Sequence, residues 1–124
     1  MSKIFIVLAM IYMHILDDYV LQGILANLKQ RSWWKQNYPD KLYEYDFIVA
    51  LLMHAMSWSF MIMLPIAAYY GFNVGKDFLA IFYINVVGHA IMDHAKANMH
   101  MANLITDQIF HLYQIGRTAA IFLL

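Results

Sequence analysis

The sequence has no cysteine, only two prolines and five glycines, and few charges of either sign. Without cysteine the chain has neither disulfides nor thiolate metal ligands. Charged residues make up 13% of the 124 residues, and their formal sum is zero. Soluble domains carry roughly 25% charged residues, about twice as many. A neutral chain also lacks the basic surface that nucleic-acid binding requires, so we expect no nucleic-acid partner.

Hydrophobic residues are abundant instead, at 63% of the chain. The usual fraction in soluble domains is roughly 45–50%, so we predict an integral membrane protein with the lipid bilayer as its surroundings. The length fits a single domain, residues 1–124. The first apolar run is followed by His14, Asp17 and Asp18 rather than by a small-residue cleavage site. We therefore do not expect a cleaved signal peptide.

Four apolar segments predict four transmembrane helices, at about residues 3–28, 47–70, 78–97 and 104–124. About 20 helical residues cross the hydrocarbon core of a bilayer. The connections are short, so consecutive helices should be antiparallel, and the predicted fold class is all-α, a four-helix up-down bundle. The longest connection, residues 32–46, mixes tryptophan and tyrosine with lysine and acidic side chains. That composition is typical of a membrane–water interface.

Lysine and arginine are unevenly distributed between the two predicted faces of the membrane. Five lie on the face that carries residues 32–46, and two or three lie on the opposite face. Positive residues accumulate on the cytoplasmic side, so we predict that residues 32–46 are cytoplasmic. Both termini would then lie on the other side of the membrane.

Ionisable side chains recur within these apolar segments at four-residue spacing. His14 and Asp18 share one helical face, as do His89 and Asp93, while His54 stands alone in the second segment. Antiparallel threading at 1.5 Å per residue places all of these groups about 6–21 Å from the same membrane surface. Ionisable groups inside a membrane are costly and are usually functional. The predicted cluster comprises His14, Asp18, His54, His89, Asp93, Asp107 and His111.

Imidazole and carboxylate ligands without thiolates suit a divalent metal ion, zinc first, with manganese or iron as alternatives. Seven groups exceed what one tetrahedral ion needs. Either two ions bind, or some aspartates orient the imidazole rings instead of coordinating. Simpler interpretations stay open: His54 as a buried core histidine, and each His/Asp pair as a hydrogen-bonded pair. We expect Asp17 to be interfacial and His94 to face solvent.

The motifs resemble those of a family of small bacterial and phage membrane proteins, catalogued as domain of unknown function 3307. The family's opening pattern is His, two apolar residues, Gly, Asp, an aromatic, two apolar residues and Gln. Residues 14–22 follow it, with Asp17 in place of glycine. The further matches are Leu-Leu-Met-His54, His89-x-x-x-Asp93-x-x-Lys96 and Asp107-Gln108-x-x-His111.

The resemblance covers nearly the whole chain and implies a bacterial inner-membrane location, but no activity. A weaker likeness, through Gly88-His89-x-x-x-Asp93, links the chain to membrane-bound metal-dependent hydrolases. The leading hypothesis is therefore a membrane-embedded metal-dependent hydrolase acting on a lipid or lipid-linked substrate. In it Asp18 is the general base and Ser57 a weaker candidate nucleophile.

Two other hypotheses belong to different classes. A carrier or channel for divalent cations or protons would also use buried His/Asp chains, and four short helices would need a homo-oligomer to form it. A carrier or channel needs polar residues that continue to the opposite face of the membrane. Only Tyr12, Asn85 and Gln114 could line such a route. A non-catalytic membrane protein would use the polar layer only to fix helix pairing.

Overall fold

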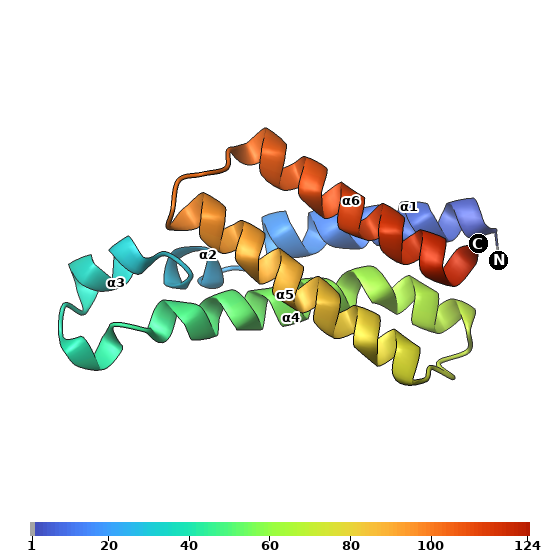
Figure 1. The fold of residues 1–124 in the computed structure, drawn as a ribbon, viewed down its shortest axis with the longest axis horizontal. Helices are drawn as coiled ribbons and strands as arrows, with labels where there is room; N and C mark the ends of the chain where they lie inside the picture. Colours follow the sequence, from blue (N-terminus) through green and yellow to red (C-terminus); the bar gives the residue numbers. More distant parts are fainter. Residues whose placement is uncertain (1) are drawn as a thin grey trace.

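A computed structural model describes residues 2–124, and this part of the chain is all-helical, without strands (Figure 1). It has six α-helices, one π-helical turn and one 3₁₀ turn. In chain order they are α1 (Lys3–Leu16), the π-helical turn η1 (Asp17–Leu21), α2 (Leu25–Leu28), α3 (Arg31–Asn37), the 3₁₀ turn η2 (Lys41–Tyr43), α4 (Asp46–Tyr69), α5 (Lys76–Ala97) and α6 (Leu104–Leu123).

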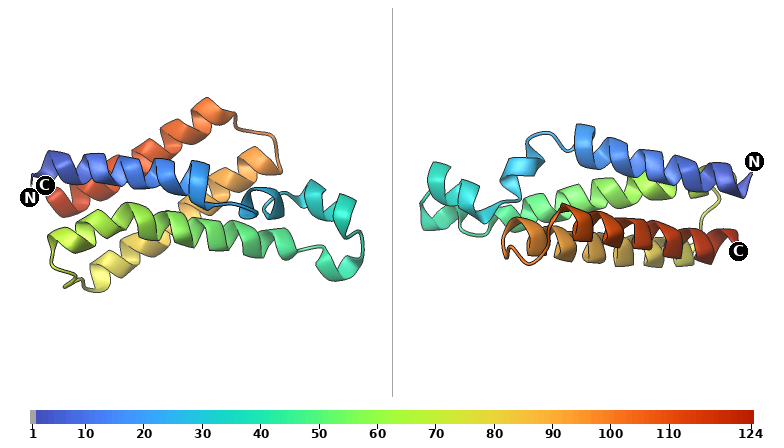
Figure 2. Two further views of the ribbon diagram at one scale, coloured as in Figure 1. Left: turned by 180° about the vertical axis from the view of Figure 1, so that it is seen from behind. Right: turned by 90° about the horizontal axis from the view of Figure 1, so that it is seen from above.

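The four long helices alternate in direction along the molecule (Figures 1 and 2). Helix α4 packs against both α1 and α5, and α6 packs against the same two neighbours. Helices α5 and α6 run obliquely to α4. Both termini lie at one end with the turn between α4 and α5. The short helices α2 and α3 and the link between α5 and α6 lie at the opposite end, which we call the loop end.

The first long helix differs from the predicted helix over residues 3–28. Regular α-helix stops at Leu16, and the π-helical turn follows. The chain then turns at Gly23, whose φ of 52° is left-handed and suits a residue without Cβ. Helix α2 begins after this turn and carries the chain across the loop end. The break lets residues 25–29 lie over α4 and α5 instead of continuing along the axis of α1.

The other long helices lie close to their predicted ranges. Helix α6 begins after Asn103, whose Oδ1 accepts a hydrogen bond from the backbone N–H of Thr106 at 2.9 Å. Asn103 is thus the N-cap of α6, and it satisfies a free donor of the first turn. Residues 32–46, predicted as an interfacial loop, contain α3 and the 3₁₀ turn η2. Trp34 of α3 stacks on Tyr43 of η2, with ring centroids 6.3 Å apart.

The burial of polar side chains and the exposure of large apolar ones differ from the pattern of a typical water-soluble protein. Buried side chains include histidines and aspartates, whereas large apolar side chains such as Phe5, Leu8 and Ile91 are exposed. An apolar cluster fills the end near the termini, around Trp58, Ile62 and Ile66. Within residues 2–124, three helices are long and apolar enough to cross a membrane: Lys3–Leu21, Lys41–Tyr69 and Lys76–Ala97. Helix α6, which carries Asp107 and Arg117, is not among them.

Candidate metal centre

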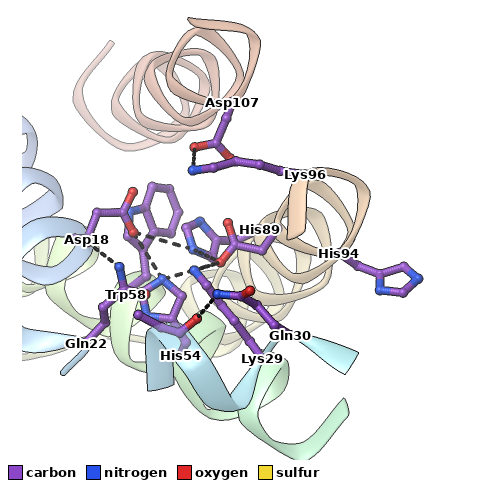
Figure 3. A network of polar contacts seen from close by, with 12 residues as sticks. Asp18, Gln22, Lys29, Gln30, His54, Trp58, His89, His94, Lys96 and Asp107 are labelled. Carbon is purple, nitrogen blue, oxygen red and sulfur yellow. Dashed lines mark hydrogen bonds and ion pairs between the residues drawn. The ribbon is translucent and has the colours of Figure 1, made fainter. Parts of the chain in front are cut away.

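Five ionisable side chains from four separate segments meet in the interior of the bundle. Figure 3 shows three of them, Asp18, His54 and His89, beside Trp58. One group that can hold a metal ion combines Asp18, His54 and His89, with one ligand atom from each within 4.8 Å of the others. The other combines His89, Asp93 and His111 on the same criterion. The two groups share His89, so the five residues form one continuous cluster. All three imidazoles in it are fully buried.

The separations within the cluster are those of ligands around an ion. The Nε2 atom of His89 lies 3.6 Å from Asp93 Oδ2 and 3.8 Å from Asp18 Oδ1. Asp93 Oδ2 lies 3.5 Å from the Nε2 atom of His54. These distances are long for hydrogen bonds. Donors bound to one tetrahedral zinc at about 2.0–2.2 Å lie about 3.3–3.6 Å apart, which matches most of them.

Several imidazole nitrogens in the cluster lack hydrogen-bond partners. Within residues 2–124, both ring nitrogens of His89 and the Nε2 atom of His111 are without a hydrogen-bond partner. The His89 ring is stacked between Trp58 and His111, with centroid distances of 4.3 and 4.1 Å. A buried polar atom without a partner is costly, so each needs an explanation. A coordinated divalent ion would occupy the lone pairs that this packing turns toward the carboxylates.

The π-helical turn explains how two consecutive aspartates both enter the interior. In an α-helix, neighbours such as Asp17 and Asp18 point about 100° apart, so only one would face the cluster. The wider turn of a π-helix, which often marks functional sites, changes this angular relation. Asp18 Oδ1 lies 3.1 Å from His54 Nε2. Asp17 is fully buried, so the expectation that it is interfacial is wrong.

Asp17 contacts the far side of the His54 ring. Its Oδ2 lies 3.6 Å from His54 Nδ1, while its Oδ1 accepts a hydrogen bond from Ser57 Oγ at 2.6 Å. At 3.6 Å this carboxylate oxygen makes no hydrogen bond to the ring, but it lies on the side where an orienting group of a metal-bound imidazole would stand. Ser57, a candidate nucleophile by sequence, is thus bound to Asp17.

His14 lies beside the cluster but has no free nitrogen. Its Nδ1 accepts a hydrogen bond from Trp58 Nε1 at 2.8 Å, and its Nε2 lies 2.9 Å from Gln108 Oε1. Since the indole N–H can only donate, the proton of His14 is on Nε2 and is given to Gln108. This structure therefore places His14 among the groups that surround the cluster, not among those that can coordinate.

A second support fixes His111. Gln114 donates from Nε2 to the backbone oxygen of Asn85 at 3.1 Å, and its Oε1 faces His111 Nδ1 at 3.4 Å. This amide orientation favours a proton on Nδ1 and leaves Nε2 of His111 free for coordination. The close approach needs Gly88, because a Cβ there would lie 2.8 Å from Gln114 Nε2.

Two lysines contact carboxylate oxygens of the cluster and its edge. Lys29 Nζ lies 2.8 Å from Asp93 Oδ2, and Lys96 Nζ lies 2.9 Å from Asp107 Oδ2. The other oxygen of Asp107 lies 3.1 Å from His111 Nε2. Asp107 therefore bridges a lysine and a candidate ligand, and it stands at the edge of the cluster.

The structure thus brings together five of the seven residues predicted from sequence, and it places His14 and Asp107 next to them. His94 points away from the cluster, as Figure 3 shows, and stacks on Phe47 at 5.9 Å. Sequence reasoning missed Trp58, which lies one helical turn from His54 on the same face and could have been found by that spacing. It gave Lys29 no role in the cluster, and no sequence pattern indicates that its side chain turns inward.

Comparisons with known proteins add no relative. No model of a known protein family matches the chain. Neither the curated proteins nor the solved structures contain a match. What the chain does must therefore be inferred from the site itself.

Proposed function

We propose that this chain is an integral membrane protein, a four-helix bundle that binds a divalent metal ion, most simply zinc, between its helices. The set of 3.5–3.9 Å separations among His54, His89, His111 and the two central aspartates carries this proposal. Both ring nitrogens of His89 and the Nε2 atom of His111 have no hydrogen-bond partner among the described residues, and one or two ions in the cluster would give such buried nitrogens a partner.

The membrane assignment is supported by the exposed apolar side chains of the long helices. Tyr12, Phe60 and Ile109 lie on three different helices, and each is more than half exposed. In water such a surface would be far more apolar than a monomer tolerates. In lipid it is the expected exterior, and the polar groups are buried where lipid does not reach.

We further propose that the bound ion serves hydrolysis of a lipid or lipid-linked substrate. A divalent ion supplies Lewis acidity and makes water a nucleophile at neutral pH. Asp18 lines a small pocket that reaches the cluster, so it is placed to accept a proton from water. Asp17 and Gln114 stand beside the imidazoles of His54 and His111. The depth of the cluster favours a substrate that is itself in the membrane.

A carrier or channel remains a second candidate because polar contacts continue beyond the cluster. Asn85 donates to Thr118 Oγ1 at 2.9 Å and accepts from Arg117 Nη2 at 3.0 Å. The apolar cluster around Ile62 and Ile66 lies between this network and the end near the termini. Because this apolar end offers no polar route across the bundle in the part of the chain described, it favours the hydrolase proposal over a carrier or channel. Cation flux into liposomes without lipid turnover would reverse this order.

Elemental analysis of the purified protein tests the metal directly. We expect one or two equivalents of a divalent ion in the wild type and a loss of at least half of it in His89→Ala. His94→Ala is the matched control, because it removes an imidazole from the same helix outside the cluster. Equal metal content in all three proteins would contradict the site.

Hydrolysis has its own test, on metal-loaded protein in vesicles that contain phosphorylated and esterified lipids. We expect turnover that chelation abolishes and that His89→Ala removes. If the metal-loaded protein hydrolysed neither lipid class, the metal site would be unaffected but the hydrolase proposal would be contradicted.

A further inference from the structure

A small polar pocket opens onto the cluster from the loop end, with a volume of about 120 Å³. At about 30 Å³ per water molecule, it holds about four waters. The lining includes the central carboxylates of Asp18 and Asp93 and two cationic side chains, Lys29 and Lys96. Figure 3 shows the lysines reaching toward the cluster from two different sides. The pocket is therefore the place where a reacting group can approach a bound ion.

Lys29 is held in this position by its backbone. Asn98, at the end of α5, donates from Nδ2 to the carbonyl oxygen of Lys29 at 3.0 Å. The Oδ1 of the same asparagine accepts from the backbone N–H of Arg31 at 2.6 Å. The Lys29 side chain is only 12% exposed. These bonds fix the turn between α2 and α3 against α5 and direct the ammonium group inward.

A metal ion would change what Lys29 contacts. Its Nζ binds the oxygen of Asp93 that also faces His54 and His89, at 3.5 and 3.6 Å. An ion held by those three groups would therefore neutralise the carboxylate that Lys29 now neutralises. Two cations on one oxygen repel each other. The ammonium of Lys29 would then be available to an anion in the pocket, opposite Lys96.

We propose that this pocket binds the phosphate group of the substrate between Lys29 and Lys96, with the metal site beneath it. The inference rests on the proposed function and narrows it to phosphate esters. Three carboxylates, those of Asp18, Asp93 and Asp107, line the pocket, so an anion can approach only if cations face it. A phosphate has oxygens for both ammonium groups and for an ion. A neutral carboxylic ester carries no charge for either ammonium group to bind.

The test measures phosphate binding and metal content on the same detergent-purified, zinc-loaded protein. Inorganic phosphate is the first probe, acetate the control anion, and micelles with a phosphomonoester lipid or an uncharged lipid separate a headgroup from free phosphate. In Lys29→Gln and in Lys96→Gln we expect phosphate affinity to fall about tenfold with zinc retained. Lys35→Gln and Lys41→Gln, in the exposed loop, should bind like the wild type. Lys29→Arg and Lys96→Arg should keep most of the affinity, which guards against loss by misfolding.

The outcomes separate the two proposals. A wild type that binds no metal overturns the proposed function and, with it, this inference. Normal zinc content without phosphate binding overturns the inference alone. The same holds if phosphate affinity is unchanged in both glutamine variants, because the lysines are then only counter-ions of Asp93 and Asp107.

Discussion

Asp17 and His54 are a buried carboxylate and imidazole beside the candidate metal centre. The carboxylate is fully buried, is bound by Ser57, and lies behind the Nδ1 atom of His54. The opposite ring nitrogen faces Asp18 and Asp93. For His54 to bind an ion through Nε2, its proton must lie on Nδ1, the nitrogen that faces Asp17.

Replacing Asp17 by Asn keeps the shape of this side chain and removes its charge. The amide is a weaker acceptor for His54, so we expect zinc affinity to fall about 10–100-fold with the helices intact. A competition titration with a chelator measures the change. Asp77→Asn, at the exposed start of α5, is the control and should have no effect. Unaltered affinity in Asp17→Asn would mean that packing alone orients His54.

Gly88 and Gly116 offer a matched pair for testing the contact between α5 and α6. A Cβ on Gly88 would lie 2.8 Å from Gln114 Nε2, while nothing lies within 4 Å of one on Gly116. Gly88→Ala should lower the free energy of unfolding by about 1–3 kcal/mol, because Gln114 must leave the Asn85 carbonyl. Gly116→Ala should be neutral or stabilise by up to about 1 kcal/mol through helix propensity.

Denaturant titration in detergent measures both glycine variants. Equal free energies of unfolding for Gly88→Ala and Gly116→Ala would refute the expected difference. Zinc affinity adds a second measurement: Gly88→Ala should weaken it, because Gln114 also faces His111, whereas Gly116→Ala should not.

At the scale of elements, the sequence predicts helices and the spacing of their ligands well. His89 and Asp93 lie on one face of α5 because four residues make about one turn. The π-helical turn was beyond such reasoning, since a regular α-helix was assumed through Asp17. The inward position of Lys29 depends on a tertiary contact, the bonds from Asn98, which no local pattern of residues 25–31 encodes.

The turn that ends the first long helix depends on Gly23. Its φ of 52° costs an L-residue with a Cβ about 1–2 kcal/mol. Gly23→Ala should therefore lower the free energy of unfolding by about that amount and disturb the approach of Lys29 to Asp93. Gly75→Ala is the control, since its φ is −110° and its surroundings are open. Equal stability of the two variants in detergent would show that this turn is not strained.

At the scale of the whole molecule, the antiparallel order of the long helices could be predicted, whereas α6, predicted as a fourth span, is not among the three helices that qualify by length and composition within residues 2–124. Short links between the long segments fix the alternation in direction. Helix α6 carries Asp107, His111 and Gln114 in or beside the cluster, and these polar residues lower its mean hydropathy. The same residues that place α6 against the metal centre thus remove it from the helices that qualify as spans.

The sidedness of the two termini decides whether α6 crosses the membrane. Both termini lie at one end of the molecule, and residues 31–46 lie at the other (Figures 1 and 2). With four crossings, reporter fusions at the N- and C-termini should report the same side, and a reporter inserted near Pro39 should report the cytoplasmic side. Three crossings would instead put the termini on opposite sides. Since α6 is antiparallel to α5 in this bundle and brings His111 and Asp107 to the cluster, termini on opposite sides would contradict the four-helix topology on which the candidate metal centre depends.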